Sequence, residues 1–337
     1  MVAQNAEKCN AGDKTLLCAN PGPSVLTSPY RSHVGVYIRK DSALSLSRTG
    51  LTVSQRLPIL TAIRVEEKIM KIKANGISMN YEITGSGRWF TLIHGAGDNL
   101  EAWWNQVPVF SRHYQVLTYD VRGYGQTETP PGEYSTDILV QDLGELLKGL
   151  GIEETYLLGY SMGGRIAVEF TLKNPAVVKV LIIANSGVAP LERSQEEMKQ
   201  MMEMRQQRME IVEKQGLAPI MDESTAMVFS PGWPDENRDV VEQYKKIRLK
   251  NDPQAYLIAM RAMVWGMAPP DVSSIKCPTL IIAGEKDGLM GAESGRASQQ
   301  LIPGSQLKVM VTGHAAAIEK PEEFNSTVLE FLAGLGS

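Results

Sequence analysis

The chain has 337 residues, with 34 basic and 38 acidic side chains and a formal net charge of −4. An apolar fraction of 43% and a charged fraction of 21% are globular values, which exclude a wholly disordered chain. The acidic balance predicts no nucleic-acid partner, and no apolar run reaches the roughly 18 residues that a membrane helix needs. The three cysteines form neither a disulfide framework nor a metal-binding spacing, which favours a reducing, cytoplasmic compartment.

The first 69 residues differ from the rest in composition. They carry nine Lys/Arg and five Asp/Glu, for a net +4, whereas residues 70–337 carry 25 and 33, for a net −8. They are rich in Ser, Thr and Pro, and they lack the basic start and apolar core of a secretory signal. Residues 1–69 are therefore predicted to be a poorly ordered leader or extension. The globular pattern begins at Met70, and the hypothesis that Met70 is the natural start competes with that of a genuine extension.

From Met70 onward, short apolar strands alternate with helical patterns. Asn75-Gly76 predicts a hairpin that joins strands at 71–74 and 78–84. Further strands are predicted at 89–93, 114–119, 155–159, 178–184, 279–283 and 306–311, and helices at 137–150, 163–173 and 322–332. This alternation predicts an α/β fold, with a mainly parallel sheet and helices on both faces.

Residues 188–271 interrupt the alternation between two core strands. The segment is helical by composition and contains ten of the sixteen methionines. It is predicted to be a helical cap, inserted between core segments 70–187 and 272–337.

A glycine-flanked serine lies in Gly159-Tyr160-Ser161-Met162-Gly163, which matches the G-x-S-x-G pattern of a nucleophile elbow. The bare pattern is weak, because it also arises by chance in glycine-rich turns. Here a predicted strand runs directly into it and a predicted helix runs directly out. This context predicts that Ser161 is a nucleophile held in strained geometry at the turn.

A serine hydroxyl needs a base near neutral pH, and the chain has only four histidines. His33 lies in the leader, His113 lies in a polar turn typical of the surface, and His94 at a strand end suits a structural role. His314 follows the last predicted strand, at the edge where the sites of open α/β sheets gather. His314 is therefore the predicted base.

The base in turn needs a carboxylate that fixes its tautomer and stabilises its charged form. Asp287 follows the strand at 279–283, which gives the chain order Ser, Asp, His. Glu285 shares this loop and is the competing acid. The end of the strand after the Ser161 helix is another place for the acid, but Asn185 lies there and has no carboxylate. Asp287 is the predicted acid.

Acyl transfer also requires N–H donors for the developing oxyanion. One is expected from the Met162 backbone, at the start of the helix after the serine. The other is assigned to the Ala96 N–H, in His94-Gly95-Ala96-Gly97 after the strand at 89–93.

From about Met70 to Leu335, the chain resembles α/β-hydrolases of the bacterial carboxylesterase, enol-lactonase and haloperoxidase-like group. The segments that carry this resemblance are 94–97, 120–125, 159–163, 284–287, 313–314 and 319–324. The resemblance implies an eight-stranded sheet, a helical cap after the sixth strand, and a structural role for Asp120 and Arg122. It implies no metal or organic cofactor.

Family resemblance leaves the reaction open. Ser161 argues against dehalogenases and epoxide hydrolases of this fold, which use an aspartate nucleophile. The sequence favours a serine carboxylesterase acting on a small-molecule ester. Lactonase or enol-lactonase activity, carbon–carbon bond hydrolysis, perhydrolysis and interfacial lipase activity are alternatives. A binding module without turnover is the non-enzyme alternative, and the oligomeric state stays open.

Side chains from the cap are candidates for the substrate pocket. Its methionines, including Met202, and Trp265 suit a soft apolar lining, and Trp104 is a further candidate from the core. Such a lining predicts short or medium uncharged acyl esters, although these residues also suit plain packing of the cap. Enol-lactonases bind anionic substrates, for which Arg193, Arg205, Arg208 and Arg261 are candidates, with surface solvation as the alternative.

Overall fold

The computed structural model describes residues 8–10, 15–17, 70–132, 134–188, 194–262 and 270–336. The chain divides into two units, Met1–Val65 and Glu66–Ser337. In the first unit, β1 (Lys8–Asn10) and β2 (Thr15–Leu17) pair antiparallel. The remainder of the predicted leader, residues 1–69, lies outside the described residues.

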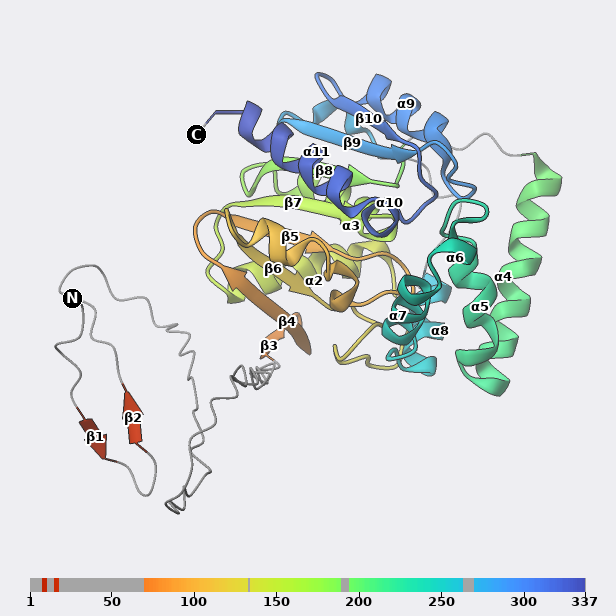
Figure 1. Ribbon diagram of the computed structural model, residues 1–337, viewed down its shortest axis with the longest axis horizontal. Helices are drawn as coiled ribbons and strands as arrows, with labels where there is room; N and C mark the ends of the chain where they lie inside the picture. Colours follow the sequence, from red (N-terminus) through yellow and green to blue (C-terminus); the bar gives the residue numbers. More distant parts are fainter. Residues whose placement is uncertain are drawn as a thin grey trace, which may run out of the picture. The chain divides into compact units, whose positions relative to one another are not determined.

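The second unit is built on an eight-stranded sheet (Figure 1). Its order is β10-β9-β8-β7-β5-β6-β4-β3, with antiparallel pairing only at β3–β4 and β4–β6. The predicted mostly parallel sheet is thus confirmed. In chain order the strands are β3 (Met70–Ala74), β4 (Ile77–Gly85), β5 (Trp89–Ile93), β6 (Gln115–Tyr119), β7 (Thr155–Tyr160), β8 (Val178–Ala184), β9 (Thr279–Gly284) and β10 (Gln306–Met310).

Helices cover both faces of this sheet. Successive residues of a strand point to opposite faces, so Leu181 and Ile183 of β8 join one apolar cluster, and Val180 and Ile182 join another. Helices α2 (Thr136–Gly149), α3 (Met162–Lys173) and α9 (Gly291–Leu301) pack on the first face. Helices α1 (Val107–Phe110) and α11 (Pro321–Gly334) pack on the second face, which α11 crosses in Figure 1.

Three short elements were not predicted from the sequence pattern. Besides α1, these are η2 (Val272–Ser274) and α10 (Ala316–Glu319), and the short helix η1 (Leu100–Trp103) lies between β5 and α1. Each has only three or four residues, too few for a helical period to emerge. Helix α9 was also not predicted, because its residues are mostly small or polar and Leu301 is its one large apolar side chain.

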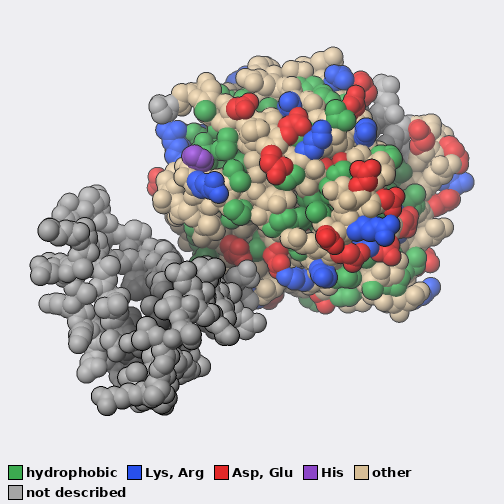
Figure 2. Space-filling model, in the orientation of Figure 1, with side chains coloured by type: hydrophobic (Ala, Val, Ile, Leu, Met, Phe, Trp, Pro, Cys, Tyr) green, Lys and Arg blue, Asp and Glu red, His purple; other side chains and the backbone are tan. Residues whose placement is uncertain are grey.

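The helices of the predicted cap follow β8, the sixth strand of the sheet. They are α4 (Gln195–Gln215), α5 (Ala218–Ala226), α6 (Trp233–Glu236), α7 (Arg238–Arg248) and α8 (Pro253–Ala262). Ser194 and Glu197 form a capping box that starts α4, and Gly216 ends it. None of the described helices is long and apolar enough to cross a membrane. On the face seen in Figure 2, acidic and basic side chains are interspersed over the folded core.

A buried ion pair ties the hairpin, the segment after β6 and α2 together. Arg122 donates from Nε and Nη2 to the two oxygens of Asp142, at 2.7 and 2.6 Å. Asn75, in the hairpin turn at φ 46°, donates to the same carboxylate at 2.7 Å. Removing one partner of a buried pair leaves an uncompensated charge, which costs more than an exposed pair contributes.

We therefore expect Asp142→Ala to lower the free energy of unfolding by about 3–5 kcal/mol, because Arg122 is left buried without a counter-charge. Urea denaturation measures this loss. Glu145→Ala, on the same helix, is the matched control, because Glu145 is exposed and pairs with the exposed Lys148. Equal losses for the two variants would contradict the role assigned to the buried pair.

Candidate active site

Ser161 lies in a sharp turn between β7 and α3. Its backbone has φ 53° and ψ −116°, a region that residues other than glycine rarely adopt. A Cβ at Gly159 would lie 2.1 Å from the Gly163 carbonyl oxygen, and a Cβ at Gly163 would lie 2.2 Å from the carbonyl oxygen of Ile93. The two glycines of the motif are therefore required by the close approach of backbone around the serine.

The structure brings the three predicted catalytic side chains together. His314 Nε2 lies 2.8 Å from Ser161 Oγ, and His314 Nδ1 lies 2.8 Å from Asp287 Oδ2. A carboxylate only accepts hydrogen bonds, so Nδ1 carries the proton and Nε2 is free to accept the serine hydroxyl proton. This arrangement suits a serine nucleophile, a histidine base and an aspartate that orients it.

Asp287 is anchored by more than His314. Its Oδ1 accepts the N–H groups of Leu289 and Met290 at 2.9 and 3.0 Å, and Asn185 Nδ2 lies 3.4 Å from Oδ2. Burial acts to raise the pKa of Asp287, but the His314 contact and the two amides outweigh it, so the pKa is lowered. The carboxylate thus stays charged opposite the imidazole. The competing acid, Glu285, is exposed.

Two backbone N–H groups, one adjacent to the serine in sequence and one in the loop after β5, have no acceptor among the described residues. They belong to Met162, the first residue of α3, and to Ala96, in the loop after β5. These are the two predicted oxyanion donors. An N–H without an internal partner at a helix start is available to an anionic ligand.

His94 holds this region together as a structural residue. It is fully buried, its Nε2 accepts the Val121 N–H at 3.0 Å, and its Nδ1 lies 2.8 Å from the Gly95 carbonyl oxygen. Burial lowers the pKa of His94 despite the nearby Asp120. A neutral ring protonated on Nδ1 satisfies both contacts, and it links the ends of β5 and β6.

Neither histidine of the site offers a free ring nitrogen to a metal. Both nitrogens of His94 and both of His314 have hydrogen-bond partners. In the part of the chain that the structure describes, no group of three or more His, Cys, Asp or Glu side chains is placed to hold a metal ion.

The loop that carries His314 is also bound to the cap, a contact that was not predicted from the sequence. Glu319 Oε1 accepts the N–H groups of Gly313 and Ser230 at 2.8 Å each, and Oε2 accepts the Ser230 hydroxyl at 2.6 Å. The Ala315 N–H donates to the Val228 carbonyl at 2.7 Å. In the sequence, the available sign of this contact was an acid five residues after the base, in Glu319-Lys320-Pro321.

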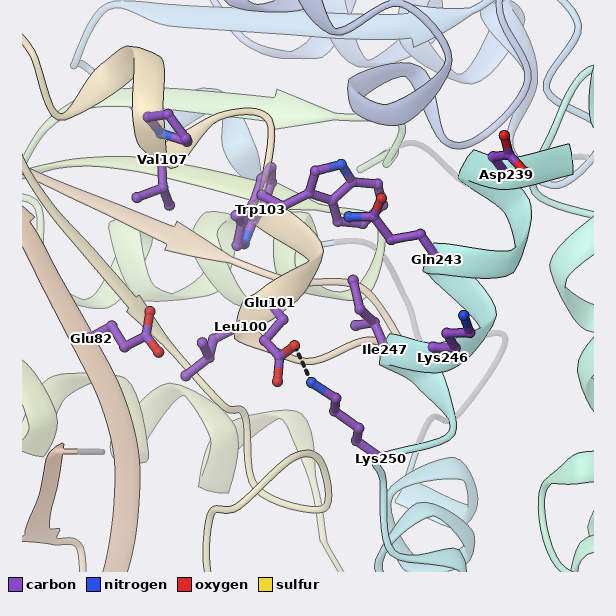
Figure 3. A pocket seen from close by; sticks show the side chains of 12 residues that line it. Glu82, Leu100, Glu101, Trp103, Val107, Asp239, Gln243, Lys246, Ile247 and Lys250 are labelled. Atoms are coloured by element: carbon purple, nitrogen blue, oxygen red, sulfur yellow. Dashed lines mark hydrogen bonds and ion pairs between the residues drawn. The ribbon is translucent and has the colours of Figure 1, made fainter. Parts of the chain in front are cut away.

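The predicted substrate-lining residues gain no support from their positions. Trp104 lines a surface cleft of about 680 Å³ between η1 and α7, together with Lys250, which pairs with Glu101 (Figure 3). None of the three triad residues lines this cleft. Met202 is 64% exposed on α4, so its side chain faces solvent instead of a pocket. Trp265 lies outside the described residues.

A family model described as alpha/beta hydrolase fold matches residues 88–321. The chain belongs to the α/β-hydrolase fold family. It is 29% identical over 259 residues to 3-oxoadipate enol-lactonase 2 of Acinetobacter baylyi, which covers 76% of this chain and 94% of that protein. This match and the fold make the protein a hydrolase.

Solved structures of this hydrolase family agree with the fold. An enol-lactonase from Burkholderia xenovorans superposes with a TM-score of 0.71 at 25% identity, covering 78% of this chain and 100% of that chain. A thermophilic esterase from Thermogutta terrifontis gives a TM-score of 0.70 at 26% identity, covering 80% of this chain and 100% of that chain. Both names concern cleavage of ester-type bonds.

We expect Ser161→Ala and His314→Ala each to lower kcat by about 10⁴-fold or more, because the nucleophile and its base act as one unit. Steady-state hydrolysis of an activated ester measures the loss, and circular dichroism checks the fold. His113→Ala, at an exposed histidine, is the control and should keep the wild-type rate. Near-normal turnover by Ser161→Ala would rule out the arrangement as a catalytic unit.

Proposed function

We propose that the protein is a serine carboxylesterase that cleaves small-molecule esters through an acyl-enzyme. The observation that carries the proposal is the continuous chain of hydrogen bonds from Ser161 through His314 to Asp287, at 2.8 Å per step. The N–H groups of Ala96 and Met162, which have no acceptor among the described residues, add the donors that such a reaction needs.

In the proposed reaction, Ser161 Oγ attacks the ester carbonyl while His314 Nε2 takes its proton. Asp287 stabilises the imidazolium that forms, and the Ala96 and Met162 amides bind the oxyanion of the tetrahedral intermediate. The imidazolium then protonates the departing alcohol, which leaves an acyl-serine. Water, deprotonated by His314, attacks the acyl group and releases the acid, which restores the serine.

A second candidate, hydrolysis of a lactone that bears a negative charge, is favoured by one arginine of the cap. Arg205 of α4 has a buried Nε without a hydrogen-bond partner among the described residues. Burial lowers the pKa of Arg205, while the neighbouring Tyr124 and Tyr256 oppose the shift. A half-buried guanidinium with an unmet donor favours an anionic ligand, which agrees with the enol-lactonase relatives.

The proposed esterase activity is tested with p-nitrophenyl esters from acetate to palmitate, with Ser161→Ala as the blank. We expect a Ser161-dependent maximum of kcat/KM at short or medium chains. A background that is equal in wild type and Ser161→Ala across the whole series would refute esterase activity. A maximum at the insoluble long chains would indicate a lipase instead.

An enol-lactone with a free carboxylate separates the two candidates. If the substrate is anionic, Arg205→Met lowers kcat/KM for the lactone by about 10- to 100-fold, the worth of one charged hydrogen bond, and spares butyrate esters. Arg261→Met is the control, because Arg261 is exposed and lies 3.9 Å from the exposed Glu213. Faster turnover of butyrate esters, with no effect of Arg205→Met on the lactone, would exclude the second candidate.

A further inference from the structure

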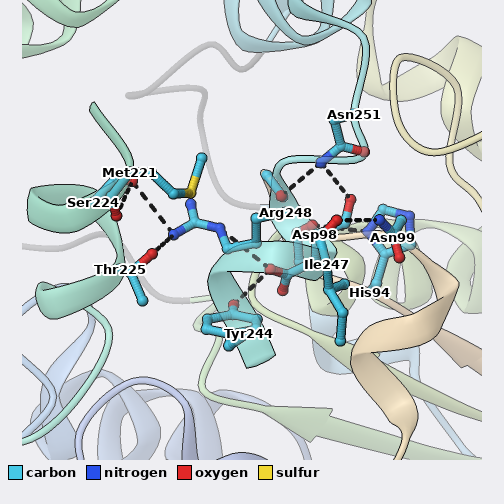
Figure 4. Close-up of polar contacts among 12 residues, drawn as sticks. His94, Asp98, Asn99, Met221, Ser224, Thr225, Tyr244, Ile247, Arg248 and Asn251 are labelled. Atoms are coloured by element: carbon cyan, nitrogen blue, oxygen red, sulfur yellow. Dashed lines mark hydrogen bonds and ion pairs between the residues drawn. The ribbon is translucent and has the colours of Figure 1, made fainter. Parts of the chain in front are cut away.

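The loop after β5, residues 94–99, is bound by the cap as well as by the core. Tyr244 of α7 donates from its hydroxyl to Asp98 Oδ1 at 2.5 Å (Figure 4). Asn99 Nδ2 donates to the Ile247 carbonyl at 2.9 Å. The end of α7 is therefore joined to this loop through two direct hydrogen bonds.

The turn after α7 adds a third attachment. Asn251 Nδ2 donates to the Gly97 carbonyl at 2.8 Å, and its Oδ1 accepts the Gly125 N–H at 2.6 Å. One side chain thus joins the loop after β5 to the loop after β6. An amide is suited to this position because it offers a donor on one side and an acceptor on the other.

A buried charge pair lies at the same junction. Asp98 is 1% exposed and Arg248 is 6% exposed, and Arg248 Nε lies 3.7 Å from Asp98 Oδ1. The guanidinium also donates to Thr225 Oγ1 of α5 at 3.0 Å. Gly97 has φ 81°, and a Cβ there would lie 2.8 Å from Arg248 Nη2, so the guanidinium packs against the loop backbone.

These contacts bear directly on the direction of the Ala96 N–H. The Gly95 carbonyl and the Ala96 N–H belong to one planar trans peptide, so they point in opposite directions. The Gly95 oxygen accepts the Asp98 N–H at 3.2 Å and contacts His94 Nδ1 at 2.8 Å. Holding Asp98 in place therefore holds the peptide whose N–H serves as an oxyanion donor.

We propose that Tyr244, Arg248 and Asn251 of the cap are positioning residues that set the oxyanion donor of Ala96 through Asp98 and Gly97. The proposal rests on the proposed function, because it concerns the same reaction. None of the three side chains needs to touch the substrate. Their effect falls on kcat, because an oxyanion donor stabilises charge that exists only in the transition state.

Tyr244→Phe is the sharpest test, because it removes the hydroxyl and keeps the ring. We expect kcat on a short ester to fall between about 10- and 100-fold, with KM within about threefold of wild type, since small misplacements of a donor are costly. Affinity for a trifluoromethyl ketone, whose serine adduct carries an oxyanion, should fall in parallel with kcat/KM. Tyr134→Phe is the matched control, because it also removes a tyrosine hydroxyl from a 2.5 Å hydrogen bond, here to the Pro130 carbonyl oxygen, which is not part of residues 94–99.

Asn251→Asp provides an independent variant if Tyr244→Phe does not fold. It is nearly isosteric, retains an acceptor for Gly125, and replaces the donor to Gly97 with a second acceptor. The same loss in kcat and in ketone affinity is expected. A wild-type kcat in either folded variant, or a loss confined to thermal stability, would overturn the proposal.

Labelling of Ser161 by a fluorophosphonate separates this proposal from the esterase assignment. The reagent needs the nucleophile and the oxyanion donors but no particular acyl chain. Slower labelling of Tyr244→Phe, with normal labelling of Tyr134→Phe, supports the positioning role even if every ester in the series fails. Equal labelling rates would overturn the positioning role while leaving the esterase activity intact.

Discussion

Three backbone segments meet around Ser161 without space for one additional carbon atom. The turn after β7 approaches the start of α3 at Gly159 and Gly163, and Gly163 also approaches the end of β5. This close approach accompanies the positive φ of Ser161, the residue that immediately precedes the first residue of α3, Met162. The same contact brings β5, and hence the loop that carries Ala96, next to the nucleophile. The remaining parts of the site are arranged around this constraint.

Asp287 and His314 follow β9 and β10, the two strands at one end of the sheet order. The cap helps to hold the loops of the site. Parallel strands β9 and β10 end at the same edge as β7, so the loops that follow them can present Asp287 and His314 toward Ser161. Glu319 binds the His314 loop to Ser230 of the cap. Tyr244 binds the loop of Ala96 to the same cap. The cap is thus joined to both loops on which the chemistry depends.

Much of this could be predicted from the sequence, because strands and catalytic motifs leave local signals. The strands at 89–93 and 178–184 were predicted with the bounds that the structure has, because both are mostly apolar runs between clear breaks. Helix ends shifted by one or two residues, as is usual where end turns fray. Ser161, Asp287 and His314 were predicted because one G-x-S-x-G pattern and four histidines leave few pairings of a nucleophile with a base.

The parts that could not be predicted depend on contacts between distant segments. Nothing local to Asp98 or Arg248 marks them as partners, since each is an ordinary charged residue until both are buried together. Trp104 and Met202 were assigned to the substrate from residue type alone. The residue type does not reveal which face of a helix packs against the protein, and the Met202 side chain is exposed. The methionine-rich helix α4 has no strong apolar stripe from which its inner face could have been inferred.

The acyl-enzyme is the central claim, and trapping it is the most direct measurement. The protein is mixed with p-nitrophenyl trimethylacetate, whose hindered acyl group slows deacylation, then quenched in acid and analysed by intact mass and peptide mapping. The account predicts a burst of nitrophenolate that matches the enzyme concentration, with the trimethylacetyl group on Ser161. Hydrolysis without an acylated protein, or with the acyl group on another residue, would contradict it.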